Sequence, residues 1–325
     1  MDSIRRAVID IGTNSVKLLV ADVAGGAVEP VLEASEQTRL GAGFFETHRL
    51  QPQAVAQTAQ AVATFAAQAR ELHAVSTRVI ATSAAREAAN PGDLTSALER
   101  AAGLKVEIIS GEQEADWAFQ GVNTDPQLAQ HPLLLLDVGG GSTEFILGQG
   151  SQKQFRRSYQ LGTVRLLEKL PPADPPTEQQ LAACRRFVKD FLEREVHPQL
   201  ALALSAQVKS AMASNPRQLV GTGGTATILA RMEKRLDTYD RGLIESTRLS
   251  AGQIQTHTKH LWQLALAERK NISGLPKSRA DVILPGVVIY EGVMELFGFS
   301  ELRISTRGLR FAAVIGTPPS SVSNP

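Results

Sequence analysis

The stretch Asp10–Lys17, with the sequence DIGTNSVK, recurs in altered form as DVGGGSTE at Asp137–Glu144. Each copy begins with an aspartate, turns through a segment that contains glycine and continues into a second apolar run. Each copy also comes after an apolar stretch, which is typical of a buried strand. Two related units in one chain indicate a duplicated fold, and we expect two similar α/β lobes that face each other.

Both glycine turns are predicted to be β-hairpins rather than turns that open a helix. Neither copy has the Gly-Lys-Ser/Thr ending of a P-loop or the G-x-G-x-x-G spacing of a dinucleotide fold. The next segments, Leu18–Val23 and Phe145–Leu147, are apolar runs without the pattern of an amphipathic helix. Glycine permits positive φ and lets backbone N–H groups approach an anion closely. One such hairpin alone would more often be structural, whereas two with the same polar signature favour phosphate binding.

The aspartates at the two turns, Asp10 and Asp137, indicate a metal ion. Each comes after an apolar strand, where a lone buried carboxylate is costly. A hard cation beside phosphate would explain them, because Mg²⁺ favours one or two carboxylates together with waters and substrate oxygens. Glu144 lies seven residues beyond Asp137 and is expected to face the same site. The predicted metal ligands are therefore Asp10, Asp137 and Glu144, with Mg²⁺ as the expected ion and Mn²⁺ as the alternative.

Length and composition restrict the class of protein. The chain has 325 residues, 43% of them hydrophobic, and a net charge of +1, which suggests about two globular domains. This near-neutral balance argues against a dedicated nucleic-acid binder. The single cysteine, Cys184, permits no internal disulfide and fits a reducing compartment. With neither a signal-peptide pattern nor an apolar run of about 20 residues, we expect a cytoplasmic protein with no membrane span.

Periodicity and turn signals divide the chain into lobes. Residues 1–124 are predicted to form the first lobe, residues 125–310 the second, and residues 311–325 a terminal helix end and flexible tail. Strands are expected at 78–82, 106–110 and 133–137 in addition to the hairpins. Helices are expected at 52–73, 91–103, 112–121, 177–195, 222–234, 252–268 and 280–297.

The chain resembles the family of exopolyphosphatases and guanosine pentaphosphate phosphohydrolases, within the superfamily of actin, sugar kinases and heat-shock chaperones. Seven ordered blocks carry the resemblance, namely Ala7–Lys17, Ala81–Asn90, Ile109–Ala115, Asp137–Glu144, Leu161–Leu166, Gly221–Thr225 and Arg279–Ile283 leading to Ser305–Arg310. The resemblance implies two duplicated ribonuclease H-like (actin-like) lobes. Each would hold a mixed five-stranded sheet with flanking helices, with a cleft between the lobes, and the family leads us to expect a homodimer.

The resemblance also implies roles for individual residues. Glu114 matches the family's catalytic glutamate, which positions or deprotonates the attacking water. From the residues alone Glu112 fits equally well, since both lie where a helix would begin. The expected phosphate-binding residues are Thr13, Asn14, Ser15, Lys17, Arg86, Gly139, Gly140, Gly141, Ser142 and Thr143.

Two departures from the family pattern affect these expectations. The family often reads Gly-Leu-Arg-Glu-Gly near its end, whereas Phe311 stands here in the position of the glutamate. Longer members carry a further helical domain with a His-Asp metal motif, which this sequence lacks. The chain is therefore similar to the short, two-domain form, and we do not expect the extended polyphosphate channel and high processivity of the long form.

The favoured function is an exopolyphosphatase that releases orthophosphate from inorganic polyphosphate. A guanosine pentaphosphate 5′-phosphatase would use the same centre, so the sequence does not separate the two. A non-catalytic sensor of alarmone or polyphosphate has no need of the full acidic set, and a kinase would need a second substrate pocket. Arg165, Arg279 and Arg307 are candidates for a polyanion track. For Gly221–Thr225, tight packing is slightly favoured over binding of a guanosine nucleotide or polyphosphate.

Overall fold

The computed structural model describes residues 3–209 and 216–316, with side chains omitted at 206–209. The chain divides into two compact units, residues 1–124 together with 307–325, and residues 125–306. The sequence-based division kept residues up to 310 with the second lobe. The structure instead assigns the segment from Arg307 onward to the first unit, because helix α15 (Leu309–Ile315) packs on strands β1 and β2. The flexible tail predicted at residues 317–325 lies outside the described residues.

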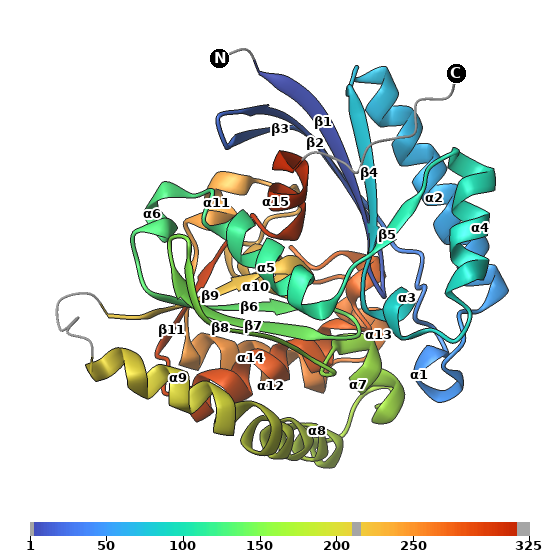
Figure 1. Ribbon diagram of the computed structural model, residues 1–325. Coiled ribbons are helices and arrows are strands. Elements are labelled where there is room, and N and C mark those ends of the chain that lie inside the picture. The colour runs from blue at the N-terminus through green and yellow to red at the C-terminus, as the bar shows by residue number, and fades with distance from the viewer. Residues whose placement is uncertain (1–2, 210–215, 317–325) are drawn as a thin grey trace. The chain divides into compact units, whose positions relative to one another are not determined.

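The first unit is built on a mixed sheet of five strands, as predicted (Figure 1). Its strand order is β3-β2-β1-β4-β5. The strands β1, β2 and β3 form an antiparallel meander, whereas β1, β4 and β5 run parallel. Their bounds are β1 Ile4–Ile11, β2 Val16–Ala24, β3 Ala27–Glu36, β4 Ser76–Ala81 and β5 Val106–Ile108.

Helices cover both faces of this sheet, so its central strands are apolar on both sides. Ile9 and Leu18 belong to the core shared with α2 (Pro52–Glu71) and α4 (Pro91–Ala102). Val8 and Leu19, one residue along each strand, point to the opposite face and join the core with α15. The helix α5 (Gly111–Val122) packs against α15, and two short helices, α1 (Phe44–Thr47) and α3 (Ser83–Glu87), complete the unit.

The second unit has a sheet of six strands in the order β10-β11-β9-β6-β7-β8. The prediction of five strands is wrong here, because the three-residue strand β10 pairs antiparallel with the edge of β11. The strands β6, β9 and β11 run parallel, and β6, β7 and β8 form an antiparallel meander. The bounds are β6 Leu133–Val138, β7 Thr143–Gln149, β8 Gln152–Tyr159, β9 Gln218–Thr222, β10 Arg248–Ser250 and β11 Glu301–Ile304.

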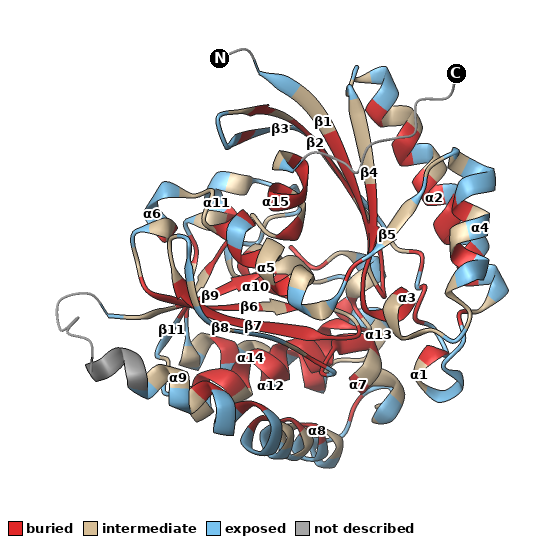
Figure 2. Cartoon of the chain, viewed as in Figure 1, coloured by how far each residue is buried: buried red, intermediate tan, exposed pale blue. Residues whose placement is uncertain are grey.

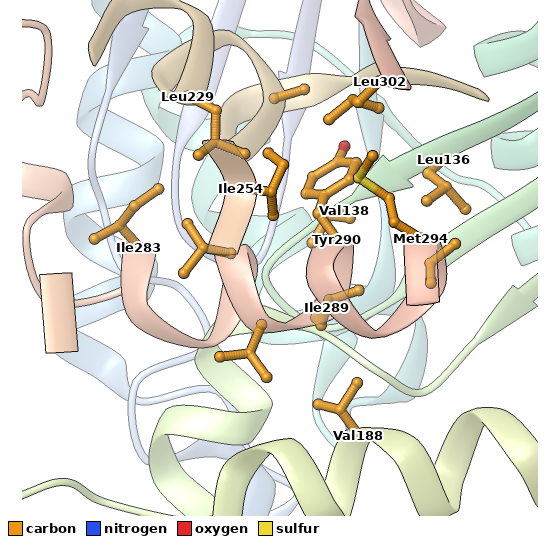
Figure 3. Close-up of a cluster of buried hydrophobic side chains, with 14 of the residues drawn as sticks. Leu136, Val138, Val188, Leu229, Ile254, Ile283, Ile289, Tyr290, Met294 and Leu302 are labelled. Carbon is orange, nitrogen blue, oxygen red and sulfur yellow. The ribbon is translucent and has the colours of Figure 1, made fainter. Parts of the chain in front are cut away.

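The core of the second unit centres on helix α14 (Ile283–Phe297). This helix is buried along almost its whole first three turns, as expected for a helix that is apolar on all sides (Figure 2). Figure 3 shows Tyr290 and Met294 of α14 among Leu136 and Val138 of the sheet. The other helices are α6 Pro126–Ala129, α7 Thr163–Lys169, α8 Glu178–Phe191, α9 His197–Lys209, α10 Gly223–Lys234, α11 Arg241–Glu245, α12 Ala251–Gln263 and α13 Leu266–Arg269, with a π-helical turn at Leu192–Val196 and a 3-10 turn at Lys277–Arg279.

Local signals account for several helix ends, and one predicted helix is divided in two. Gly103 takes φ 66° and ends α4, as predicted. Thr177 and Gln180 form a capping box that starts α8. The single helix predicted over 252–268 is instead two helices, because Leu264 is extended between α12 and α13. Within the described ranges, none of the helices combines the length and hydropathy needed to span a membrane.

Candidate functional site

Both predicted glycine hairpins are confirmed, and they have the same backbone geometry. In the first, Ile11 of β1 pairs with Val16 of β2, and the Gly12 amide donates to the Ser15 carbonyl at 3.0 Å. In the second, Val138 pairs with Thr143, and the amide of Gly139 donates to the carbonyl of Ser142 at 2.9 Å. The repeat seen in the sequence therefore corresponds to two copies of one four-residue loop.

The parallel strands of the first unit bring its predicted site residues to one edge of the sheet. Ile11, Ala81 and Ile108 are aligned at the carboxyl ends of β1, β4 and β5. Along the chain, β1 leads into the first loop, β4 into helix α3 with Arg86, and β5 into helix α5 with Glu114. The carboxyl edge of such a sheet is where α/β folds commonly bind ligands.

Arg86 and Glu114 form an ion pair at this edge. The Nη1 atom of Arg86 donates to Glu114 Oε2 at 2.9 Å and to the carbonyl of Ile109 at 3.0 Å. The Glu114 side chain is only 12% exposed, whereas Glu112 is an exposed residue of the same first helical turn. The sequence alone did not favour Glu114 over Glu112 as the candidate base, and this contact favours Glu114. Arg86, predicted to bind phosphate, contacts a carboxylate here.

Asp10 is buried opposite a lysine. It pairs with Lys17 across β1 and β2, which places both side chains on the same face of the sheet. Burial raises the pKa of Asp10, while the charges of Lys17 and Arg310 act in the opposite direction. Its Oδ1 atom has no hydrogen-bond partner among the described residues. An orphaned carboxylate oxygen of this kind fits a cation ligand.

The first loop is braced by a segment that the sequence analysis missed. Thr13, Asn14 and Ser15 are all buried. The residues 37–41 lie against them, with the amide of Gly41 donating to the carbonyl of Thr13 at 2.7 Å. A β-carbon on Gly41 would lie 2.3 Å from Thr13 Cγ2, so only glycine fits. The one available signal was the glycine pair, Gly41 and Gly43.

The second loop is held from behind by the start of α7. The amides of Thr163 and Val164 donate to the carbonyls of Gly139 at 3.0 Å and Gly140 at 2.8 Å. Arg165 Nε donates to the carbonyl of Gly141 at 2.8 Å. In a trans peptide the N–H points opposite to the C=O, so the amides of residues 140–142 point away from α7. Such a row of outward amides is a typical anion-binding nest.

Two acidic residues lie opposite each other at the second hairpin. Asp137 and Glu144 pair across β6 and β7, in the positions that Asp10 and Lys17 occupy in the first unit. Glu144 is buried and accepts a hydrogen bond from Ser158 Oγ at 2.7 Å. Two like charges directly opposite in a sheet are unfavourable unless a cation compensates them.

The hydroxyl of Thr143, a predicted phosphate-binding residue, makes a contact within the fold. Its side chain is fully buried, and its hydroxyl donates to the carbonyl of Leu161 at 2.5 Å. This bond ties β7 to the turn before α7. In this structure the hydroxyl proton of Thr143 is therefore used in a bond within the fold.

Two of the candidate metal ligands form a pair of carboxylates, and the candidates do not form a cluster of three in the described residues. Throughout residues 3–209 and 216–316, no group of three or more His, Cys, Asp or Glu side chains is arranged to hold a metal ion. Asp137 and Glu144 form one pair of oxygen donors, and Asp10 belongs to the other unit. Mg²⁺ commonly uses one or two protein carboxylates, so the donor set fits that ion.

The remaining candidates have structural contacts within their own units. Gly221 and Gly223 pack closely, since a β-carbon on them would lie 2.9 Å from the Tyr290 hydroxyl and 2.2 Å from Asp137 Oδ1, respectively. Arg279 lies beside Gly224. Arg307 donates to the Thr124 carbonyl at 3.3 Å. These close contacts are in line with the packing role favoured for the segment 221–225, and Arg307 has a contact within the fold.

Comparison with known proteins matches residues 19–317 to the Ppx/GppA phosphatase family. The chain belongs to this family. Exopolyphosphatase 2 of Mycobacterium tuberculosis is 33% identical, with 93% of this chain and 94% of that protein covered. A guanosine-5′-triphosphate,3′-diphosphate pyrophosphatase of Aeromonas hydrophila is 26% identical over 95% of this chain, which spans 58% of that longer protein. The solved structure of the Aquifex aeolicus PPX-GPPA enzyme has 30% identity and a TM-score of 0.75, covering 96% of this chain and 99% of that one.

Membership of the Ppx/GppA family agrees with the fold expected from the sequence. Both sheets combine an antiparallel meander with parallel strands and flanking helices, as in the actin-like fold of the Ppx/GppA structures. The departure at Phe311 has a structural explanation in this member of the family. Its side chain is 1% exposed and belongs to the apolar core that α15 forms with the first sheet, where burying a charged glutamate would be costly.

Proposed function

We propose that this chain hydrolyses the terminal phosphoanhydride bond of inorganic polyphosphate and releases orthophosphate. The ion pair between Arg86 and Glu114, at the sheet edge that carries the first loop, is the observation that supports the proposal most directly. The extent of the match to exopolyphosphatase 2 of Mycobacterium tuberculosis supports polyphosphate over a guanosine nucleotide.

In the proposed reaction Glu114 is the general base. Its carboxylate takes a proton from a water molecule as the water oxygen attacks the terminal phosphorus atom. The bond from that phosphorus to the bridging oxygen breaks, and the shortened chain leaves with the bridging oxygen. Arg86 holds one carboxylate oxygen at 2.9 Å, which fixes the direction in which the other can accept the proton.

The glycine loops would bind the charged phosphoryl groups. The outward amides of residues 140–142 supply donors without a side chain, which lets the backbone approach phosphate oxygens closely. Asp137 and Glu144 in the second unit, and Asp10 in the first, are the residues that would supply carboxylate oxygens to a divalent cation. Such an ion neutralises negative charge on the transferred phosphoryl group and on the leaving phosphate.

The proposal is tested by phosphate release from the purified protein, with Glu114→Gln as the decisive variant and Glu112→Gln as its matched control. Both replacements remove one carboxylate from the first turn of α5, and Glu114 is the one that is held against Arg86 at 2.9 Å, with its side chain 12% exposed. We expect Glu114→Gln to lower kcat by about 10²–10⁴-fold, the usual contribution of a general base. The Glu112→Gln variant should keep kcat within about twofold of the wild type.

The substrate is decided in the same assay with long polyphosphate, tripolyphosphate and guanosine pentaphosphate, each with and without Mg²⁺. A higher kcat/KM for guanosine pentaphosphate than for polyphosphate would show that the guanosine nucleotide is the preferred substrate. Equal activity in the Glu114→Gln and Glu112→Gln proteins would remove Glu114 from the role of base. A folded wild-type protein with no activity on any of the three would refute the hydrolase.

A further inference from the structure

The segment 37–41 does more than cover the first loop, because three of its residues bond to the loop directly. The amide of Arg39 donates to the carbonyl of Asn14 at 3.0 Å. Gln37 Nε2 donates to Asn14 Oδ1 at 3.1 Å, and the amide of Gly41 donates to the carbonyl of Thr13. The backbone of Arg39 is therefore fixed beside the residues predicted to bind phosphate.

Arg39 has a backbone conformation that residues other than glycine rarely adopt. Its φ is 51°, in the left-handed region where glycine is the usual residue. The neighbours on both sides are buried, with Thr58 Oγ1 donating to Thr38 Oγ1 at 3.0 Å and Leu40 fully buried. Arg39 itself is exposed. Backbone strain of this kind is concentrated at ligand-binding positions.

We propose that Arg39 binds a non-reacting phosphate of the substrate, next to the phosphoryl group held by the first loop. This inference rests on the proposed function and adds a recognition residue to it. The planar guanidinium can donate two parallel hydrogen bonds to one phosphate group. The buried neighbours Thr38 and Leu40, and the bond from the Arg39 amide to Asn14, fix the backbone of Arg39, so little backbone entropy would be lost on binding.

A residue that binds a distant phosphate equally in the ground state and the transition state changes KM and leaves kcat unchanged. This signature distinguishes Arg39 from Glu114, whose loss should lower kcat. It also predicts a dependence on chain length. Tripolyphosphate and longer chains have phosphates beyond the reacting bond, so they should depend on Arg39 more strongly than pyrophosphate does.

The test is the variant Arg39→Gly, because glycine adopts φ 51° without strain and the variant should fold at least as stably as the wild type. We expect KM for polyphosphate to rise about tenfold with kcat within about twofold. Arg39→Lys, which keeps the charge but loses the fork, should give an intermediate KM. Arg39→Asn, also tolerant of this φ, provides a second neutral variant.

Equilibrium binding separates this inference from the proposed function. Tripolyphosphate binding is measured by calorimetry in the Glu114→Gln protein, with and without Arg39→Gly, at several salt concentrations. We expect Kd to rise about tenfold and the slope of log Kd against log salt to fall by about one, as for loss of one phosphate contact.

An unchanged Kd and KM in a folded Arg39→Gly protein would overturn the assignment of Arg39, and so would a loss of kcat at unchanged KM. Inactivity of the wild type would refute the hydrolase, while the binding measurement would still decide the role of Arg39. Failure of the Glu114→Gln protein to bind tripolyphosphate at all would refute this inference as well.

Discussion

The two glycine hairpins share a backbone and differ in charge. Each has a four-residue loop closed by the same amide–carbonyl bond, and each has an aspartate one residue before the end of its first strand. Opposite that aspartate stands Lys17 in the first hairpin and Glu144 in the second. In the first hairpin the aspartate thus faces a lysine, whereas in the second two acidic side chains face each other. The two copies share the loop, and we expect the facing residue to affect what each copy binds.

The largest effect is expected when the residue that faces the aspartate in each hairpin is replaced by a neutral one. Glu144→Gln removes one of two opposed carboxylates, so the Mg²⁺ concentration for half-maximal activity should rise at least about tenfold. Lys17→Gln should leave the Mg²⁺ requirement within about twofold and raise KM, because it removes a cation beside phosphate. Titrating activity with Mg²⁺ in both proteins checks this. Equal shifts would show that the hairpins do not differ in metal binding.

A second test displaces Asp137 without changing its charge. A β-carbon at Gly223 would lie 2.2 Å from Asp137 Oδ1, whereas at Gly103 it would meet nothing within 4 Å. Both glycines have positive φ, so each alanine variant should lose about 1 kcal/mol of stability. Only Gly223→Ala should also lower kcat/KM, by about 10–100-fold. The same kcat/KM in both variants would show that the position of Asp137 is unimportant.

Thr143 offers a smaller contrast, since Val16 occupies the matching position in the first hairpin. Thr143→Val would leave the carbonyl of Leu161 without its buried donor, so the free energy of unfolding should fall by about 1–2 kcal/mol. KM should stay within about twofold, and Thr143→Ser should restore the stability in part. Urea denaturation and steady-state kinetics check both values. A raised KM at unchanged stability would return Thr143 to phosphate binding.

The smallest effect concerns the cost of burying Asp10. Asp10 is 9% exposed with an orphaned oxygen, whereas Asp137 is half-buried. In EDTA at neutral pH, Asp10→Asn should therefore raise the free energy of unfolding by about 1 kcal/mol while lowering turnover with Mg²⁺. Asp137→Asn should change stability less. A destabilised Asp10→Asn protein would mean that the charge of Asp10 supports the fold.

The sequence revealed the hairpins because their signals are local. Glycine spacing and the apolar runs on either side define a strand, a loop and a second strand without any knowledge of the rest of the chain. The same holds for the end of α4 at Gly103 and the start of α8 at Thr177. The sequence did not predict the strand β10, because three residues are too few to show a periodic pattern.

The contacts of the candidate site were less accessible, because they join distant parts of the chain. The pairing of Arg86 with Glu114 depends on β1, β4 and β5 lying side by side. The bracing of the first loop by residues 37–41 depends on the path of the chain after β3. A positive φ at Arg39 cannot be inferred from an arginine in the sequence, since it is imposed by the buried neighbours.

The return of the C-terminal helix to the first unit has a consequence for synthesis on the ribosome. One face of the first sheet, with Val8 and Leu19, obtains its apolar cover from α15, the last helix that the structure describes. Nascent chains that end before residue 309 therefore lack the cover that α15 supplies to this face, although every strand of the first sheet has already been translated. The N-terminal unit cannot complete its folding vectorially, and the growing polypeptide is open to aggregation or chaperone capture until translation is nearly finished.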